Sequence, residues 1–117
     1  MNMISKLAIG TYAATFLSIA AANAAGMLTA QNGMTLYTFD KDTDGVSACY
    51  DACATNWPAY VAKADDKMGD GWTQVKRKDG TMQWAYDNKP VYFFAADKAK
   101  GDKLGDGKGG VWHIIAG

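Results

Sequence analysis

The sequence is poor in the residues from which many catalytic and metal sites are built. It has one histidine, His113, and two cysteines among 117 residues. A single histidine cannot form a three- or four-ligand zinc site without help from cysteines or carboxylates. The sequence also has no Walker loop, no dinucleotide-binding fingerprint and no Ser, His and Asp in a hydrolase-like order. These absences leave no catalytic residue and no cofactor to assign, so we expect a protein that is not an enzyme.

An excess of basic charge is missing as well. The chain carries 12 basic and 12 acidic residues. Nucleic-acid-binding proteins concentrate Lys and Arg to neutralise phosphates, so we expect no nucleic-acid partner. The one basic cluster, "KRK" at 76–78, is expected to be the solvated tip of a β-hairpin.

The one long hydrophobic run lies at the start of the chain. Lys6 is followed by small and aliphatic residues that end in Ala22-Asn23-Ala24, a pattern typical of a secretory signal peptide. We expect residues 1–24 to be removed and residues 25–117 to form a single domain. Polar residues interrupt a run that is barely long enough to span a membrane, and no cysteine near the cleavage site could carry a lipid. The predicted location is periplasmic or secreted, with no membrane anchor.

The remaining chain contains an internal repeat at an offset of 55 residues. Like residues coincide at seven positions without a gap: Met27 and Met82, Ala30 and Ala85, Leu36 and Val91, Tyr37 and Tyr92, Phe39 and Phe94, Asp42 and Asp97, and Trp57 and Trp112. Each copy runs from a short apolar stretch through "AQNG" or "AYDN" into an aromatic stretch. This order predicts a β-hairpin over 27–39 and another over 82–94.

Other segments complete a mainly β prediction. Residues 71–86 alternate apolar and polar side chains around Asp79-Gly80, which predicts a third hairpin. The glycine-rich residues 99–110 predict a loop before a last strand, "VWHII". Only residues 47–56 look helical, with Ser47 as the expected N-cap. We therefore expect a small antiparallel β domain built from two related halves, with one short helix near 47–55.

Two stretches, "LYTFDKDTDGVSACYDACATNWP" and "PVYFFAADKAKGDKLGDGKGGVWHII", resemble the two halves of the bacterial secreted-repeat family. This family comprises exported proteins and predicted lipoproteins that share a repeated Tyr-x-aromatic-x-x-Asp motif. The resemblance implies export and a shared fold. Because the family has no assigned function, the resemblance transfers no catalytic residue. Many of these relatives carry a lipid-accepting cysteine at the cleavage site, which this sequence lacks, so membrane attachment is not implied.

Cys49 and Cys53 are the whole cysteine complement. An exported protein meets an oxidising compartment, so a disulfide between them is the expected state. Four helical residues would separate their α-carbons by about 6 Å, within the range of a disulfide. A structural link is the first interpretation. A redox-active pair at a helix start is the alternative, although the Cys-x-x-Cys spacing and a βαβ pattern are both missing.

Metal binding is a second alternative. Asp40, Asp42, Asp44 and Gly45 match the opening of a calcium-binding EF-hand loop, but Asp51 replaces its final glutamate, and an aspartate-rich turn explains the segment better. His113 could bind Cu(I) together with methionine thioethers from Met27, Met34, Met68 or Met82. His113, Asp40 and Asp44 are therefore metal candidates, within an alternative function of thiol-redox or copper handling in the cell envelope.

Aromatic residues are abundant for so short a chain, with four Trp and six Tyr. A small domain cannot bury all of them, so some are expected to form an exposed patch or shallow groove. We expect a non-enzymatic binding or interaction module whose partner is a small ligand or an envelope protein. The candidate contact residues are Tyr37, Phe39, Asp42, Tyr92, Phe94, Asp97, Trp57 and Trp112.

Overall fold

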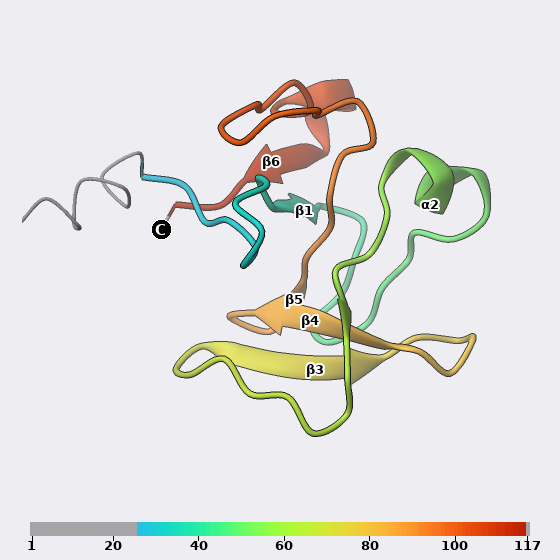
Figure 1. Cartoon of the computed structure of the whole chain (residues 1–117). Helices are drawn as coiled ribbons and strands as arrows, with labels where there is room; N and C mark the ends of the chain where they lie inside the picture. The colour runs from blue at the N-terminus through green and yellow to red at the C-terminus, as the bar shows by residue number, and fades with distance from the viewer. Residues whose placement is uncertain (1–25, 117) are drawn as a thin grey trace, which may run out of the picture.

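The computed structural model describes residues 26–116. The predicted signal peptide and its cleavage site lie outside the described residues. Within 26–116, no helix has the length and apolar character needed to cross a membrane. Strands predominate, all strand pairing is antiparallel, and one short α-helix is present (Figure 1). This confirms the predicted fold class.

A two-stranded sheet joins the two copies of the repeat. Strand β1 (Tyr37–Phe39) belongs to the first copy and pairs with β6 (Trp112–Ile114), at the end of the second. Phe39 lies opposite Trp112 in the register, so two large aromatic residues face one another across neighbouring strands. The strand predicted around "VWHII" is confirmed.

A second sheet contains four strands. Strand β4 (Met82–Tyr86) is central, with β2 (Val61–Ala62) on one side and β3 (Trp72–Lys76) on the other, and β5 (Lys89–Pro90) also pairs with β4. Strand β3 turns into β4 at 77–80, and β4 turns into β5 at Asp87-Asn88. Both of these turn residues have positive φ, 51° and 66°, as a type I′ turn requires. The hairpins predicted at Asp79-Gly80 and Asp87-Asn88 are therefore present.

The hairpin of the first copy is shorter than its counterpart. Its strands meet at a single bridge between Thr29 and Thr35. The chain reverses where Gly33 N–H donates to the Ala30 carbonyl, and the Asn32 side chain accepts a hydrogen bond from Met34 N–H at 2.9 Å. A turn at Asn32-Gly33 is confirmed, but the pairing that flanks it is minimal.

Helix α2 (Ala52–Asn56) begins later than the sequence predicts. Ser47 was expected to cap it, and this is wrong. The backbone of Asp51 has φ 55°, a left-handed value that a helix cannot continue through. The Ser47 hydroxyl is instead buried against the Tyr92 hydroxyl at 2.5 Å. A tertiary hydrogen bond has thus displaced the local cap.

The glycine-rich segment after the second copy is a loop, as predicted, closed by a short 3₁₀ turn, η2 (Lys108–Gly110). It leads directly into β6. The buried side chains form two clusters: one around Leu36, Trp84 and Val91, and one around Tyr37, Tyr92, Trp57, Trp112 and Cys49.

Candidate functional site

The repeated tyrosines lie side by side at the centre of the molecule. Tyr37 N–H donates to the Tyr92 carbonyl at 2.9 Å, and Tyr92 N–H donates to the Tyr37 carbonyl at 3.0 Å. Such a reciprocal pair has a local twofold axis between its two residues. Because Tyr37 and Tyr92 are equivalent positions of the two copies, the copies are related by an approximate twofold rotation about this point.

The aspartates of the motif are exchanged between the copies. The Tyr37 hydroxyl donates to Asp97 Oδ2 and the Tyr92 hydroxyl donates to Asp42 Oδ2, both at 2.7 Å. The second oxygen of each carboxylate accepts a backbone N–H from the turn that follows, Leu104 for Asp97 and Ala48 for Asp42. Each copy therefore completes the hydrogen bonding of the other, and the Tyr-x-aromatic-x-x-Asp motif locks the two halves together.

The other aromatic residues of the repeat follow the same symmetry. Trp57 and Trp112 stack with ring centroids 3.8 Å apart and planes 3° apart. Phe94 stacks on Trp57 at 4.3 Å and Phe39 stacks on Trp112 at 4.1 Å. The result is a four-ring stack, in which each tryptophan also meets a tyrosine edge-on at 5.2 Å. We call the four stacked rings, with Tyr37 and Tyr92, the aromatic centre.

The aromatic centre is a packed interior. Tyr37 and Tyr92 are fully buried, Trp57 and Trp112 are each 6% exposed, and Asp97 is 7% exposed. Gly105 closes the stack on one side, where an added Cβ would lie 2.5 Å from the Trp57 ring. Phe39, Phe94 and Asp42 are half-buried. The structure thus brings all eight predicted contact residues together, but as a core rather than as an exposed patch.

Burial changes the acid–base properties of this core. Loss of solvent raises the pKa of the Tyr37 phenol well above its ordinary value near 10, and the hydrogen bond to Asp97 raises it further. The pKa of Tyr92 is raised mainly by burial, with its bond to Asp42 adding to the effect. Burial also raises the pKa of Asp42, against the opposing hydrogen bonds from Tyr92 and Ala48 N–H.

A buried arginine forms a polar network that joins the segment before α2 to strand β4. Arg77 is 7% exposed, which corrects the expectation that "KRK" is a solvated hairpin tip, although the flanking lysines are exposed. Its guanidinium donates to Ser47 Oγ at 3.0 Å, Gln83 Oε1 at 2.8 Å and the Cys49 carbonyl at 2.8 Å. The planar donor fork of arginine suits three divergent acceptors, and its contacts hold the chain before α2 against the sheet.

Cys49 and Cys53 form the predicted disulfide, with α-carbons 5.3 Å apart. Cys49 is fully buried beside Trp57 in the aromatic centre. Only Cys53 lies within α2, so the bond joins the helix to the segment before it. The disulfide therefore restrains the segment in which the Cys49 carbonyl accepts a hydrogen bond from Arg77.

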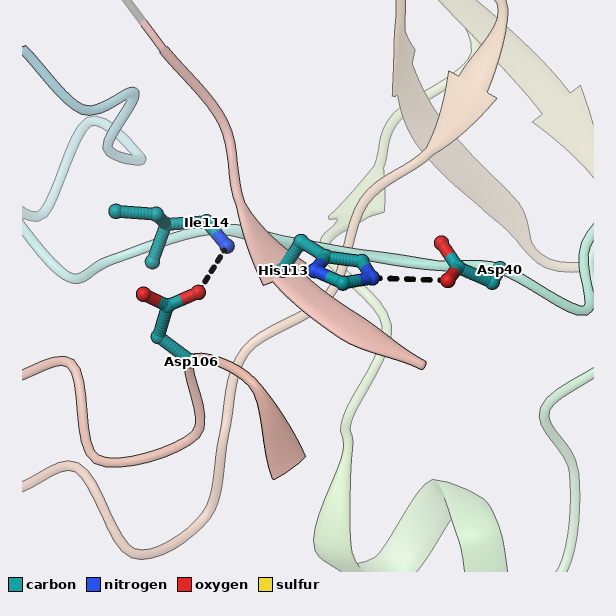
Figure 2. A network of polar contacts seen from close by, with 4 residues as sticks. All are labelled: Asp40, Asp106, His113 and Ile114. Carbon is teal, nitrogen blue, oxygen red and sulfur yellow. Dashed lines mark hydrogen bonds and ion pairs between the residues drawn. The ribbon is translucent and has the colours of Figure 1, made fainter. Parts of the chain in front are cut away.

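The metal candidates are only partly assembled. His113 Nε2 lies 2.8 Å from Asp40 Oδ2, with side chains 44% and 52% exposed. Figure 2 shows the imidazole pointing to Asp40, while Asp106 accepts the Ile114 N–H instead. Asp44 lines a small hollow of about 130 Å³ with Asp40 and Asp42. Among residues 26–116, no three His, Cys, Asp or Glu side chains are arranged to hold a metal ion.

A larger cleft lies on the four-stranded sheet, away from the repeat motif. Its volume is about 470 Å³, within the usual range for small-molecule sites. Strands β3 and β4 contribute Trp72, Gln74, Met82 and Trp84, which alternate along the strands and share one face because Gln74 pairs with Trp84. The loop between β2 and β3 contributes Met68, which packs against the core cluster that contains Trp84. Trp72 and Trp84 meet edge to face at 5.9 Å.

Gln74 lines this cleft and is tied to the loop between β2 and β3. Its Nε2 donates to the carbonyls of Lys63 and Asp66, at 2.7 and 2.9 Å, and so ties the loop to β3. Both partners are acceptors, so the amide nitrogen must face the loop. Gln74 Oε1 is buried and has no hydrogen-bond partner, and it is the one such side-chain atom in the part of the chain that the structure describes.

Sequence reasoning missed this cleft. The sequence signal was present, because Trp72 and Gln74 alternate on one side of the Asp79-Gly80 turn and Met82 and Trp84 alternate on the other. A hairpin places such residues on one face. The loop that covers this face carries no pattern of its own, so the enclosure could not be read from the sequence.

Comparison with known protein families identifies the family to which the chain belongs. The family described as "secreted repeat of unknown function" matches residues 20–60 and 73–116, which contain the two copies of the motif. The chain therefore belongs to this family of secreted repeat proteins. Searches among curated proteins and solved structures give no match.

Proposed function

We propose that this secreted repeat protein is a non-enzymatic binding module of the periplasm, and that its ligand occupies the cleft between the 63–71 loop and strands β3 and β4. The observation that carries the proposal is the cleft itself. It is about 470 Å³ in volume and is lined by two tryptophans and two methionines, with one glutamine whose oxygen lacks a partner. Binding sites typically combine apolar walls with a few placed polar groups.

The distribution of satisfied and unsatisfied groups supports this placement. In the aromatic centre both motif tyrosines are fully buried and both motif carboxylates are hydrogen-bonded, so the polar groups there are already satisfied within the protein. Trp72 in the cleft is only half-buried and has free ring surface. The Tyr-x-aromatic-x-x-Asp motifs thus build the scaffold, whereas the cleft is formed by the 63–71 loop with strands β3 and β4, outside these motifs.

The four tryptophans provide a direct test. Indole N–H signals of the ¹⁵N-labelled secreted protein are followed by NMR while indole, 2-naphthol and cyclohexanol are added separately. We expect at least one probe to shift the Trp72 and Trp84 signals in a saturable manner, with Trp57 and Trp112 serving as internal controls. If no probe shifts the cleft signals saturably, or if all four signals move alike, the proposal is wrong.

A further inference from the structure

The cleft has features that select a class of ligand, and this inference rests on the proposed function. Three properties bear on the choice: the shape and chemistry of its walls, the charges that line it, and its unpartnered acceptor.

The walls favour a flat, polarisable molecule. Trp72 and Trp84 meet edge to face at 5.9 Å, and Tyr86 packs against Trp72 at 5.2 Å, so a ring entering the cleft can continue the same aromatic packing. Met68 and Met82 line the cleft as well. Their thioethers are flexible and make favourable contacts with aromatic rings.

The charges argue for a neutral ligand. Asp66 and Lys67 are the charged residues that line the cleft. Both are exposed, and their charges are opposite. A charged group carried into the cleft would lose water without gaining a buried counter-charge, which is unfavourable.

The unpartnered acceptor in the cleft favours a ligand that carries a hydrogen-bond donor. Gln74 Oε1 is enclosed without a hydrogen bond, a state that destabilises a buried polar atom. The bonds from the same amide to Lys63 and Asp66 hold the loop over the cleft. Because the oxygen is enclosed, a ligand donor can satisfy it only if the loop or the neighbouring side chains move to admit the ligand.

From these three properties we infer that the cleft binds a neutral, planar aromatic molecule carrying an O–H or N–H group, which donates a hydrogen bond to Gln74 Oε1 while its ring packs between Trp72 and Met68. Among ligands of equal size, those with a donor should bind more tightly than those without one, because only a donor can satisfy the Gln74 oxygen.

Matched probes test this inference on the unmodified protein. 2-Naphthol and 2-methoxynaphthalene share a ring but differ in the donor. We expect 2-naphthol to bind roughly tenfold more tightly, which corresponds to about 1.4 kcal/mol. 2-Naphthoate should bind more weakly than 2-naphthol because of its charge. Equal binding of 2-naphthol and 2-methoxynaphthalene at Trp72 and Trp84 would overturn the ligand class and leave the binding module standing. Absence of any saturable shift, with cyclohexanol and indole as well, would overturn both.

Two variants of Gln74 distinguish its role as a hydrogen-bond acceptor from its role in binding the loop through Lys63 and Asp66. Gln74→Met removes the acceptor oxygen as well as the amide donors that bind the loop. Gln74→Glu keeps acceptor oxygens but loses the donors to Lys63 and Asp66. We expect the preference for 2-naphthol to disappear in Gln74→Met and to persist in Gln74→Glu. Loss of the preference in both variants, with circular dichroism spectra unchanged, would assign the preference to loop position and refute a hydrogen bond to Oε1.

Discussion

The two aromatic regions of this protein are built from similar residues and differ in how completely they are closed. In the aromatic centre, two tryptophans are each 6% exposed and the tyrosine hydroxyls and aspartates satisfy one another. In the cleft, Trp72 is half-buried and Gln74 Oε1 has no partner. The first region buries both of its tryptophans, whereas the second buries Trp84, which is 4% exposed, and leaves Trp72 half-buried. The Tyr-x-aromatic-x-x-Asp motifs therefore form the scaffold, and contacts with other molecules are expected at the cleft on β3 and β4.

The largest effect should come from opening the aromatic centre. Trp112→Ala removes a buried ring that stacks on both Trp57 and Phe39, and we expect a loss of about 3–5 kcal/mol in the free energy of unfolding. Trp72→Ala in the cleft should lose about 1–2 kcal/mol, because that ring is already partly in water. Urea unfolding followed by circular dichroism measures both. Similar losses for the two variants would remove the distinction between the regions.

Removing the buried arginine should rank next. Arg77→Met leaves the Gln83 oxygen and the Cys49 carbonyl without their donor, and we expect a loss of about 3 kcal/mol from unsatisfied buried groups. The neighbouring Lys78→Met, on an exposed side chain, is the matched control and should change stability by less than about 0.5 kcal/mol. Equal effects of the two would mean that the network around Arg77 does not stabilise the fold.

Alkaline pH should weaken the centre through its tyrosines. Their folded pKa values are raised above the ordinary value near 10, so the folded state holds the phenol protons more tightly than the unfolded state. The stabilisation is complete below about pH 10 and is lost as pH rises, by about 1.4 kcal/mol per pH unit for each tyrosine. Urea midpoints between pH 8 and 12 measure the slope. Tyr37→Phe/Tyr92→Phe should be less stable at neutral pH and have a shallower slope, and an unchanged slope would contradict the assignment.

The disulfide should contribute less than these core groups. Cys49→Ala/Cys53→Ala opens a very short covalent loop, so we expect a loss of about 2 kcal/mol or less. Binding of 2-naphthol in the cleft should be unchanged, because neither cysteine lines it. Loss of binding in a variant that still folds would connect the disulfide to function and revive the thiol-redox interpretation.

The smallest effect is expected at the exposed ion pair. His113→Gln removes the contact with Asp40, whose side chain is 52% exposed, and exposed pairs of this kind contribute about 0–1 kcal/mol. Thermal unfolding at neutral pH measures the change. A loss above about 2 kcal/mol would show that this end of β6 is more important for stability than its exposure indicates.

The sequence predicted the fold where local chemistry dominates. The Asp-Gly and Asp-Asn turns, the final strand and the disulfide follow from turn residues, alternation and cysteine count, and all are present. The offset of 55 also predicted that Tyr37 and Tyr92 occupy equivalent surroundings. Prediction failed where distant residues decide the outcome. Ser47 bonds to Tyr92 and Arg77 and does not cap the helix, and Arg77 is buried because its acceptors come from two separate segments, one with Ser47 and Cys49 and one with Gln83.

In the candidate site, too, local patterns were predicted from the sequence and features that depend on distant contacts were not. The eight candidate contact residues were expected to line an exposed surface, but they lie together in a core. Their burial depends on the crosswise exchange between copies, which no local pattern reports. The cleft depends on a loop tied down by one glutamine side chain. Its walls could be read from alternation, whereas the enclosure of Gln74 Oε1 could not.

The reciprocal pairing of Tyr37 with Tyr92 also bears on how the two halves of the chain are related. An interface in which equivalent residues bind one another about a twofold axis is isologous, the form found between subunits of homodimers. Here that interface lies inside a single polypeptide. A chain of one copy would present the same self-complementary surface, with a tyrosine lacking its aspartate and an aspartate lacking its tyrosine, and a second identical chain would supply both. Two identical subunits fused into one polypeptide would have the same geometry.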